Sequence, residues 1–258
     1  MKAANHVVMV LSGKGGVGKT TVAVNVAAAL GRRLRVGLFD ADLHGPNVPK
    51  MLGIEGATMR VHDGKLLPVP TSYDVAVVSI AFGLPTADTP LIWRGPLKMK
   101  AIREFLEDVA WGELDLLVID LPPGTGDEAL SVAQVVGQVD AALVVTTPQA
   151  VALLDARKAV NFARKVGVKH IGVVENMASL RCPHWGAEID LFGQGGAERM
   201  AEEIGVPFLG RLPLLPEVVE SGDRGRPAVA SDPPEVREAF LVLAQRVWDF
   251  IGGHAGLG

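Results

Sequence analysis

The chain has 258 residues, of which 48% are hydrophobic and 21% are charged, so it is long enough to bury a sizeable globular core. Its net charge of −4 provides no basic footprint, so we expect neither nucleic acid nor a membrane as a partner. One cysteine excludes an intramolecular disulfide framework, no apolar run suits a signal peptide or a membrane span, and a cytoplasmic location is therefore expected.

Short apolar runs alternate with amphipathic segments along almost the whole chain. The apolar runs predict strands near 6–11, 34–39, 75–80, 114–120, 139–146, 168–175 and 207–212. The amphipathic segments predict helices near 18–31, 96–110, 127–137, 150–167, 193–205 and 234–251. This alternation predicts a three-layer α/β fold, with a mostly parallel sheet covered by helices on both faces. We expect one domain over residues 1–251 and a flexible tail over 252–258.

Two segments have simple structural interpretations. Asp63-Gly64 lies between short apolar runs and predicts a hairpin turn. The last predicted helix, 234–251, has an apolar face and carries acidic as well as basic residues, so we expect it to pack on the core rather than on a membrane.

The first predicted strand leads into a glycine-rich segment, residues 12–21, that fits the phosphate-binding pattern G-x-x-x-x-G-K-[ST]. Its glycines let backbone N–H groups point inward, and the next helix directs its positive end to the same place, so an anion is expected there. Lys19 is expected to reach the β- and γ-phosphates, and the Thr20 hydroxyl to ligate Mg²⁺. The predicted nucleotide contacts in this loop are Gly13, Lys14, Gly15, Gly16, Val17, Gly18, Lys19, Thr20 and Thr21. A chance glycine-rich turn is the alternative, but it does not explain the flanking strand and helix.

Two aspartates, Asp40 and Asp42, follow the second predicted strand. Because ligands of parallel sheets bind at the carboxyl ends of the strands, these side chains are placed to approach the γ-phosphate, Mg²⁺ and an attacking water. Capping of a helix N-terminus is the alternative, and it could account for one of the two.

Asp120 ends an apolar strand, which is the arrangement of a Walker B carboxylate that holds Mg²⁺ directly or through water. The segment that follows, residues 121–127, contains two glycines that permit a backbone N–H to contact the γ-phosphate and then release it. A Pro-Gly turn capped by Asp127 is compatible with the same residues.

Lys14 is not required by the general phosphate-binding pattern. The sequence GKGGVGKT resembles the deviant loop of the ATPase superclass that includes MinD, ArsA, the nitrogenase iron protein and the Mrp-like iron–sulfur carriers. In that group the extra lysine crosses a dimer interface to the partner's nucleotide, so the resemblance implies a homodimer in which Lys14 and Lys19 are catalytic. It also implies that Asp42 orients the attacking water. A solvated lysine at a loop tip is the alternative for Lys14.

Five further strings narrow the resemblance to one family. They are DLHGPNVPKML (42–52), WRGP (93–96), DLPPGTGD (120–127), TPQ (147–149) and ENM (175–177). Together they resemble the Mrp/ApbC family of P-loop ATPases, which carry iron–sulfur clusters to apoproteins, over about residues 5–250. The resemblance implies that Asn176 hydrogen-bonds the adenine edge and that Pro213 flanks the base. A turn-capping amide is the alternative for Asn176.

One departure from the family concerns the metal. Cluster-carrying members usually have C-P-x-C after the N-M element, whereas this chain has Cys182 and His184 followed by Trp185 in place of the second cysteine. Two chains therefore offer two thiolates, and one hypothesis is a mixed site in which Cys182 and His184 of each chain bind the cluster. The alternative is a free thiol in a loop beside a surface histidine.

The resemblance implies a homodimeric, Mg²⁺-dependent ATPase that hydrolyses ATP slowly and delivers an iron–sulfur cluster to apoprotein recipients. An alternative of another class is a MinD- or ParA-like nucleotide switch without a metal cluster, which requires a membrane or DNA surface that the sequence does not contain. A metabolic kinase built on the same loop is a third alternative, and it requires an acceptor pocket.

Overall fold

The computed structural model describes residues 4–83, 95–182 and 185–253. The described residues form an eight-stranded central sheet in the order β12-β9-β8-β1-β7-β2-β6-β5. All neighbours in this sheet pair in parallel except β5 and β6, which are antiparallel. Its strands are β1 (Ala4–Leu11), β2 (Val36–Asp40), β5 (Val69–Pro70), β6 (Val75–Ser79), β7 (Leu114–Asp120), β8 (Ala141–Thr146), β9 (His170–Glu175) and β12 (Phe208–Arg211). The predicted mostly parallel sheet is confirmed.

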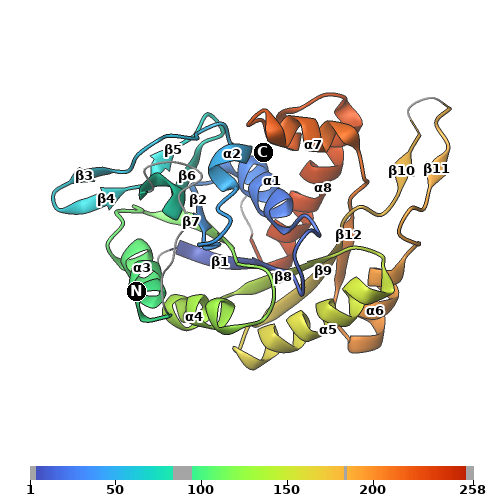
Figure 1. Cartoon of the computed structure of the whole chain (residues 1–258), viewed down its shortest axis with the longest axis horizontal. Coiled ribbons are helices and arrows are strands. Elements are labelled where there is room, and N and C mark those ends of the chain that lie inside the picture. Colours follow the sequence, from blue (N-terminus) through green and yellow to red (C-terminus); the bar gives the residue numbers. More distant parts are fainter. Residues whose placement is uncertain (1–3, 84–94, 183–184, 254–258) are drawn as a thin grey trace.

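Helices cover both faces of this sheet (Figure 1). One face carries α1 (Lys19–Gly31), α2 (Val48–Met51), α7 (Pro216–Asp223), α8 (Pro234–Phe250) and the short 3₁₀ helix η2 (Ala228–Ala230). The other face carries α3 (Gly95–Glu107), α4 (Asp127–Val136), α5 (Ala150–Lys165) and α6 (Gly196–Ile204). A second 3₁₀ helix, η1 (Ile80–Gly83), follows β6.

Strand β1 shows why two cores form. Its side chains alternate between the faces, so Val8 and Val10 belong to the core under α1 and α8, whereas Met9 and Leu11 belong to the core under α4 and α5. All four are fully buried. A parallel sheet covered on both faces requires such continuous apolar strands, and the sequence supplies them.

The predicted hairpin is confirmed. β3 (Arg60–His62) and β4 (Lys65–Leu67) pair antiparallel, and Asp63 (φ 49°) and Gly64 (φ 76°) both adopt left-handed conformations in the turn. Two left-handed central residues are typical of the tight turn that matches strand twist.

The C-terminal helix packs on the core, as predicted. Its apolar face lies against α1 and is buried through Val236, Phe240, Leu243 and Val247. None of the helices within the described ranges is long and apolar enough to cross a bilayer. Of the predicted tail, Gly253 is buried, and its N–H donates to the Trp248 carbonyl at 3.0 Å; residues 254–258 lie outside the described part.

The prediction did not include α2, α7, the short strand β5, the two 3₁₀ helices, or the hairpin of β10 (Leu180–Arg181) and β11 (Glu188–Ile189). The helix α2 has only four residues, which is too few to show a helical period. The hairpin projects away from the body of the molecule beyond β12 (Figure 1).

Both borders of the sheet have a protective feature. Border strand β5 has two residues, one of which is Pro70, and proline has no N–H to donate. At the other border the Arg246 Nη1 of α8 donates to the Leu209 carbonyl of β12 at 3.1 Å.

Candidate functional site

The glycine-rich loop joins β1 to α1 at the carboxyl end of the sheet. Gly18 precedes α1 in a left-handed conformation (φ 82°), and no side chain caps the first turn of the helix. The backbone N–H groups of that turn are therefore available to an anion. Gly13 is also required, because a Cβ there would lie 2.2 Å from the Asp155 carbonyl carbon of α5.

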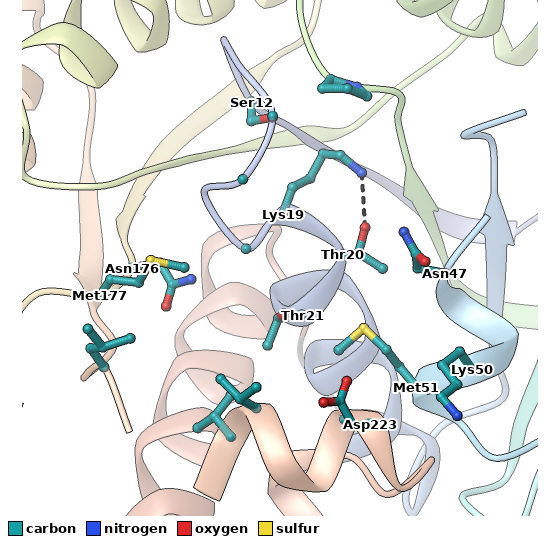
Figure 2. A pocket seen from close by; sticks show the side chains of 18 of the residues that line it. Ser12, Lys19, Thr20, Thr21, Asn47, Lys50, Met51, Asn176, Met177 and Asp223 are labelled. Atoms are coloured by element: carbon teal, nitrogen blue, oxygen red, sulfur yellow. Dashed lines mark hydrogen bonds between the residues drawn. The ribbon is translucent and has the colours of Figure 1, made fainter. Parts of the chain in front are cut away.

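Lys19, Thr20 and Asp120 meet at the mouth of this loop. The Lys19 Nζ lies 2.6 Å from Asp120 Oδ1, and the Thr20 hydroxyl donates to Asp120 Oδ2 at 2.7 Å. Figure 2 shows Lys19 and Thr20 directed toward each other, with Nζ and Oγ1 3.3 Å apart. Burial raises the pKa of Asp120, and the Lys19 charge opposes that shift.

This donor set fits the ligands that were predicted for it. A hydroxyl and a carboxylate oxygen in direct contact are hard oxygen ligands of the kind that Mg²⁺ prefers, and a buried ammonium beside them suits a phosphate. The structure therefore brings together Lys19, Thr20 and Asp120, which come from segments about a hundred residues apart.

The two aspartates that follow β2 have different surroundings. Asp40 is fully buried, pairs in register with Asp120 across β2 and β7, and accepts hydrogen bonds from Ser79 Oγ (3.1 Å) and from the N–H of Val48 (3.3 Å), the first residue of α2. Asp42 is half-buried and lines the cavity beside the loop. Asp40 therefore binds the first N–H of α2 without being its N-cap residue, which is Asn47, whereas Asp42 faces the site.

Asp42 also fixes the loop that carries it. Its Oδ1 accepts hydrogen bonds from the N–H groups of His44 (3.2 Å) and Gly45 (3.1 Å). His44 Nε2 in turn lies 3.0 Å from Glu128 Oε1 at the start of α4. This loop is therefore joined to the segment that follows Asp120.

Asp40 makes the stability of the fold depend on pH. Burial, and then the nearby Asp120 charge, raise its pKa well above the ordinary value. Above pH 4 the folded protein thus binds more protons at this site than the unfolded chain does, so the wild-type fold loses stability as pH rises toward the raised pKa. Since asparagine does not titrate, Asp40→Asn is expected to gain stability relative to wild type across this window, by up to about 1.4 kcal/mol per pH unit.

Urea unfolding at several pH values between 4.5 and 7 measures this difference. Asp190→Asn, at an exposed aspartate, supplies the comparison. A stability difference between Asp40→Asn and wild type that does not change with pH would contradict the assignment.

The site continues into a cavity of about 420 Å³. Asn176 and Met177 lie on one wall, whereas Asn47, Lys50 and Met51 lie on the opposite wall (Figure 2). Other lining residues, in the segments after β12 and in α7, are Pro213, Leu214, Leu215, Val218, Val219, Gly222 and Asp223. A cavity that joins a glycine-rich loop to a wall of apolar side chains with a few polar groups has the character of a nucleotide site.

Asn176 lies at the end of β9 and touches the glycine-rich loop. Its Nδ2 donates to the Val17 carbonyl at 2.9 Å, and a Cβ at Gly18 would lie 2.1 Å from the same nitrogen. Asn176 and Pro213 both line the cavity, so the structure brings the two residues predicted for the base to one compartment.

Lys14 and the segment 121–127 lie around the loop itself. Lys14 is half-buried, and its carbonyl accepts a hydrogen bond from Ser12 Oγ at 2.9 Å. The Gly124 N–H donates to the Ser12 carbonyl at 2.9 Å, so the two loops are in direct contact. Of the predicted loop residues, Gly15, Gly16, Gly18, Lys19, Thr20 and Thr21 line the cavity, whereas Gly13, Lys14 and Val17 are not among the lining residues.

Sequence reasoning missed the contributions of α2 and α7. Met51 and Lys50 of α2 and Val218 and Asp223 of α7 all line the cavity. The proline at the first position of α7, Pro216, is typical of a helix start and could have indicated this helix.

Cys182 follows β10 in the projecting hairpin and is buried, with 7% of its surface exposed, rather than open to solvent. Its N–H donates to the Ala187 carbonyl at 2.9 Å, and its carbonyl accepts from the Gly186 N–H at 2.8 Å. His184 lies outside the described residues, as do Trp93 and Arg94. Among the residues that are described, no three His, Cys, Asp or Glu side chains of one chain gather where they could hold a metal.

Comparison with known proteins decides the family. Residues 3–248 match the ParA family, in the group described as NUBPL iron-transfer P-loop NTPase. The chain belongs to this family. The predicted Mrp-like resemblance is thus confirmed, and the iron-transfer P-loop NTPase fold accounts for the loop and the parallel sheet.

Curated relatives of this iron-transfer P-loop NTPase agree with the match. An iron-sulfur cluster carrier protein of Methanocaldococcus jannaschii is 45% identical over 254 residues, which cover 98% of this chain and 87% of the relative. An iron-sulfur cluster carrier protein of Pyrococcus horikoshii is 48% identical over 257 residues, which cover 95% and 86%.

Two solved structures are similar in fold. A nucleotide-binding protein of Archaeoglobus fulgidus in complex with ADP has a TM-score of 0.76 and 38% identity, over 87% of this chain and 88% of that one. MinD of Pyrococcus horikoshii, complexed with Mg-ADP, has a TM-score of 0.71 and 27% identity, over 98% and 99%.

Proposed function

We propose that this P-loop NTPase binds and slowly hydrolyses Mg-ATP as a homodimer, and that it carries an iron–sulfur cluster to recipient apoproteins. The observation that carries the nucleotide part is the contact of Lys19 and Thr20 with Asp120 at the mouth of the glycine-rich loop. The names of the relatives, cluster carriers that share nearly half of their residues with this chain, support the cargo.

Each residue of the nucleotide site has a proposed role. Thr20, Asp120 and Asp42 would hold Mg²⁺, which offsets phosphate charge when bound. Lys19 binds the β- and γ-phosphates, and Asp42 orients the attacking water from the cavity wall. Lys14 would stabilise the charge that develops on the partner chain's nucleotide. Asn176 and Pro213 hold the base.

The cargo site is proposed to combine the two copies of Cys182 in a dimer. A dimer of this chain contains two cysteines, so the thiolates can supply two cluster ligands, and His184 of each chain would be the additional donor. The burial of Cys182 means that its hairpin must rearrange, or must pair with another copy, before the sulfur binds iron.

Anaerobic reconstitution with iron and sulfide tests this site. We expect wild type to gain visible absorption with iron and sulfide bound, because thiolates are the usual cluster ligands, and Cys182→Ala to bind neither. His184→Ala is expected to weaken retention of the cluster, which iron counting after gel filtration measures. A colourless wild type, or a fully coloured Cys182→Ala protein, would contradict the proposed cluster site. Neither result would affect the proposed nucleotide site.

The runner-up is a MinD-like switch that positions partner proteins without a metal. The similarity to MinD favours it, but the face of α8 that carries Val236, Phe240, Leu243 and Val247 is buried on the core and is not available to a membrane. Co-sedimentation with anionic vesicles or DNA, in the presence of Mg-ATP, distinguishes the two proposals.

A further inference from the structure

We infer that Glu175 is a positioning residue that couples the base end of the nucleotide cavity to the hairpin that carries Cys182. The inference rests on the proposed function and adds a route that starts at the base, whereas the loops that follow β2 and β7 lie at the phosphate end. Three observations support the inference. They are a ladder of backbone hydrogen bonds, a buried carboxylate that joins the two ends of the segment 175–197, and the left-handed conformation of Met177.

The backbone ladder joins the cavity wall to the hairpin. The Leu212 N–H donates to the Glu175 carbonyl (2.8 Å), the Ala178 N–H to the Leu212 carbonyl (3.0 Å), and the Leu214 N–H to the Ser179 carbonyl (2.8 Å). A parallel bridge between Leu180 and Leu214 continues the ladder to the first residue of β10. Both sides of this ladder include residues that line the cavity, so movement of one side is transmitted to the other.

Glu175 closes the segment at its other end. Its side chain is 1% exposed, and its Oε2 accepts a hydrogen bond from the Ala197 N–H at the start of α6 at 2.8 Å. Its Oε1 lies 3.8 Å from the Arg211 Nε of β12, and Arg211 also pairs with Glu198 of α6 at 2.6 Å. The Glu175 carboxylate therefore joins the two ends of the segment 175–197, which contains the hairpin. Glu175 is also the residue directly before Asn176.

Met177 connects the cavity to the start of the segment 175–197, because its side chain lines the cavity. It lies between Asn176 and Ala178, within the span of the ladder. Its φ of 57° is left-handed, which is uncommon for a residue with a long side chain. A strained residue persists only where its surroundings determine its conformation. The hydrogen bonds of Glu175, Asn176 and Ala178 supply that constraint. A base that contacts Met177 would therefore shift the backbone of this segment and, through the ladder, the conformation of the hairpin.

Cys182 is the only cysteine in the sequence, so its alkylation rate reports on the hairpin without any introduced label. We expect saturating Mg-ADP to slow alkylation of the full chain by iodoacetamide at least about fivefold, the lower end of ordinary coupling between two sites. Magnesium tripolyphosphate, which has no base, is expected to leave the rate within about twofold. Protein alkylated at Cys182 is also expected to bind ADP more weakly, which calorimetry measures.

Variants assign this effect to Glu175. Glu175→Gln removes the charge that faces Arg211, and Glu175→Asp keeps the charge but shortens the reach to Ala197; both are expected to bind ADP and to lose most of the slowing. Glu198→Gln, which removes only the outer partner of Arg211, should keep the slowing and is the matched control. Circular dichroism checks that each Glu175 variant is folded. Because the two variants differ in chemistry, the test remains valid if one of them does not fold.

Calorimetry on the same samples separates the possible failures. Absence of Mg-ADP binding would overturn the proposed function itself. Normal Mg-ADP binding with an alkylation rate that does not fall would overturn only the coupling, and equal slowing in wild type and in both Glu175 variants would remove Glu175 from the route. Slowing that grows over a tenfold increase in protein concentration would assign the effect to association of copies and would also overturn the inference.

Discussion

Replacement of Lys19 by alanine is expected to weaken binding of Mg-ATP at least about 100-fold, because it removes a buried cation from the phosphate end of the cavity. Lys19 is buried at the mouth of the glycine-rich loop, with its Nζ 2.6 Å from Asp120. Isothermal titration calorimetry measures the change directly.

The variant must be separated from a folding defect, because loss of Lys19 leaves Asp120 buried without its cation. Lys19→Gln, which retains a hydrogen-bond donor, and thermal unfolding of each variant provide that check. Lys65→Ala removes an exposed lysine on β4 and is the control for charge alone. Binding of Mg-ATP by Lys19→Ala with wild-type affinity would overturn the proposed nucleotide site.

Replacement of Lys14 by alanine is expected to leave Mg-ATP binding almost unchanged and to lower the rate of ATP hydrolysis about 1,000-fold, the effect of losing a cation supplied in trans. Lys14 is half-buried at the loop and is not among the residues that line the cavity of its own chain, which agrees with a role outside that cavity. Steady-state phosphate release measures the loss.

A mixing experiment tests whether the lysine acts in trans. Lys14→Ala chains bind nucleotide and Lys19→Ala chains retain Lys14, so an equimolar mixture should recover about a quarter of wild-type hydrolysis, since half of the dimers are mixed and each has one complete site. A cis-acting Lys14 predicts no recovery. Unchanged hydrolysis by Lys14→Ala alone would also contradict the proposal.

The strands, the major helices and the phosphate end of the site could be predicted from the sequence because each has a local signal. β1 and β7 are continuous apolar runs that end beside polar residues, and the carboxyl ends of parallel strands must meet at one edge. That rule places Asp120 and Lys19 at the same edge, although about a hundred residues separate them, and the pairing of β1 with β7 brings them into contact.

The remaining features depend on tertiary contacts that no local pattern encodes. Asp40 and Asp42 look equivalent in the sequence, and only the packing of Ser79 and α2 separates a buried structural carboxylate from one that faces the cavity. Likewise, the contact of Asn176 with Val17 joins β9 to a loop at the other end of the chain. The burial of Cys182 depends on the local hydrogen bonds to Gly186 and Ala187 in its hairpin, which its flanking sequence does not reveal.

The protected borders of the sheet limit how two chains can associate. A strand from another molecule would meet Pro70 at β5 and, at β12, a Leu209 carbonyl that already accepts a hydrogen bond from Arg246, so both borders are less favourable for strand addition. Growth of a continuous intermolecular sheet is thereby disfavoured, including the runaway form that leads to fibrils. Association of two chains is consequently more compatible with contacts between side-chain surfaces than with pairing of their sheet borders.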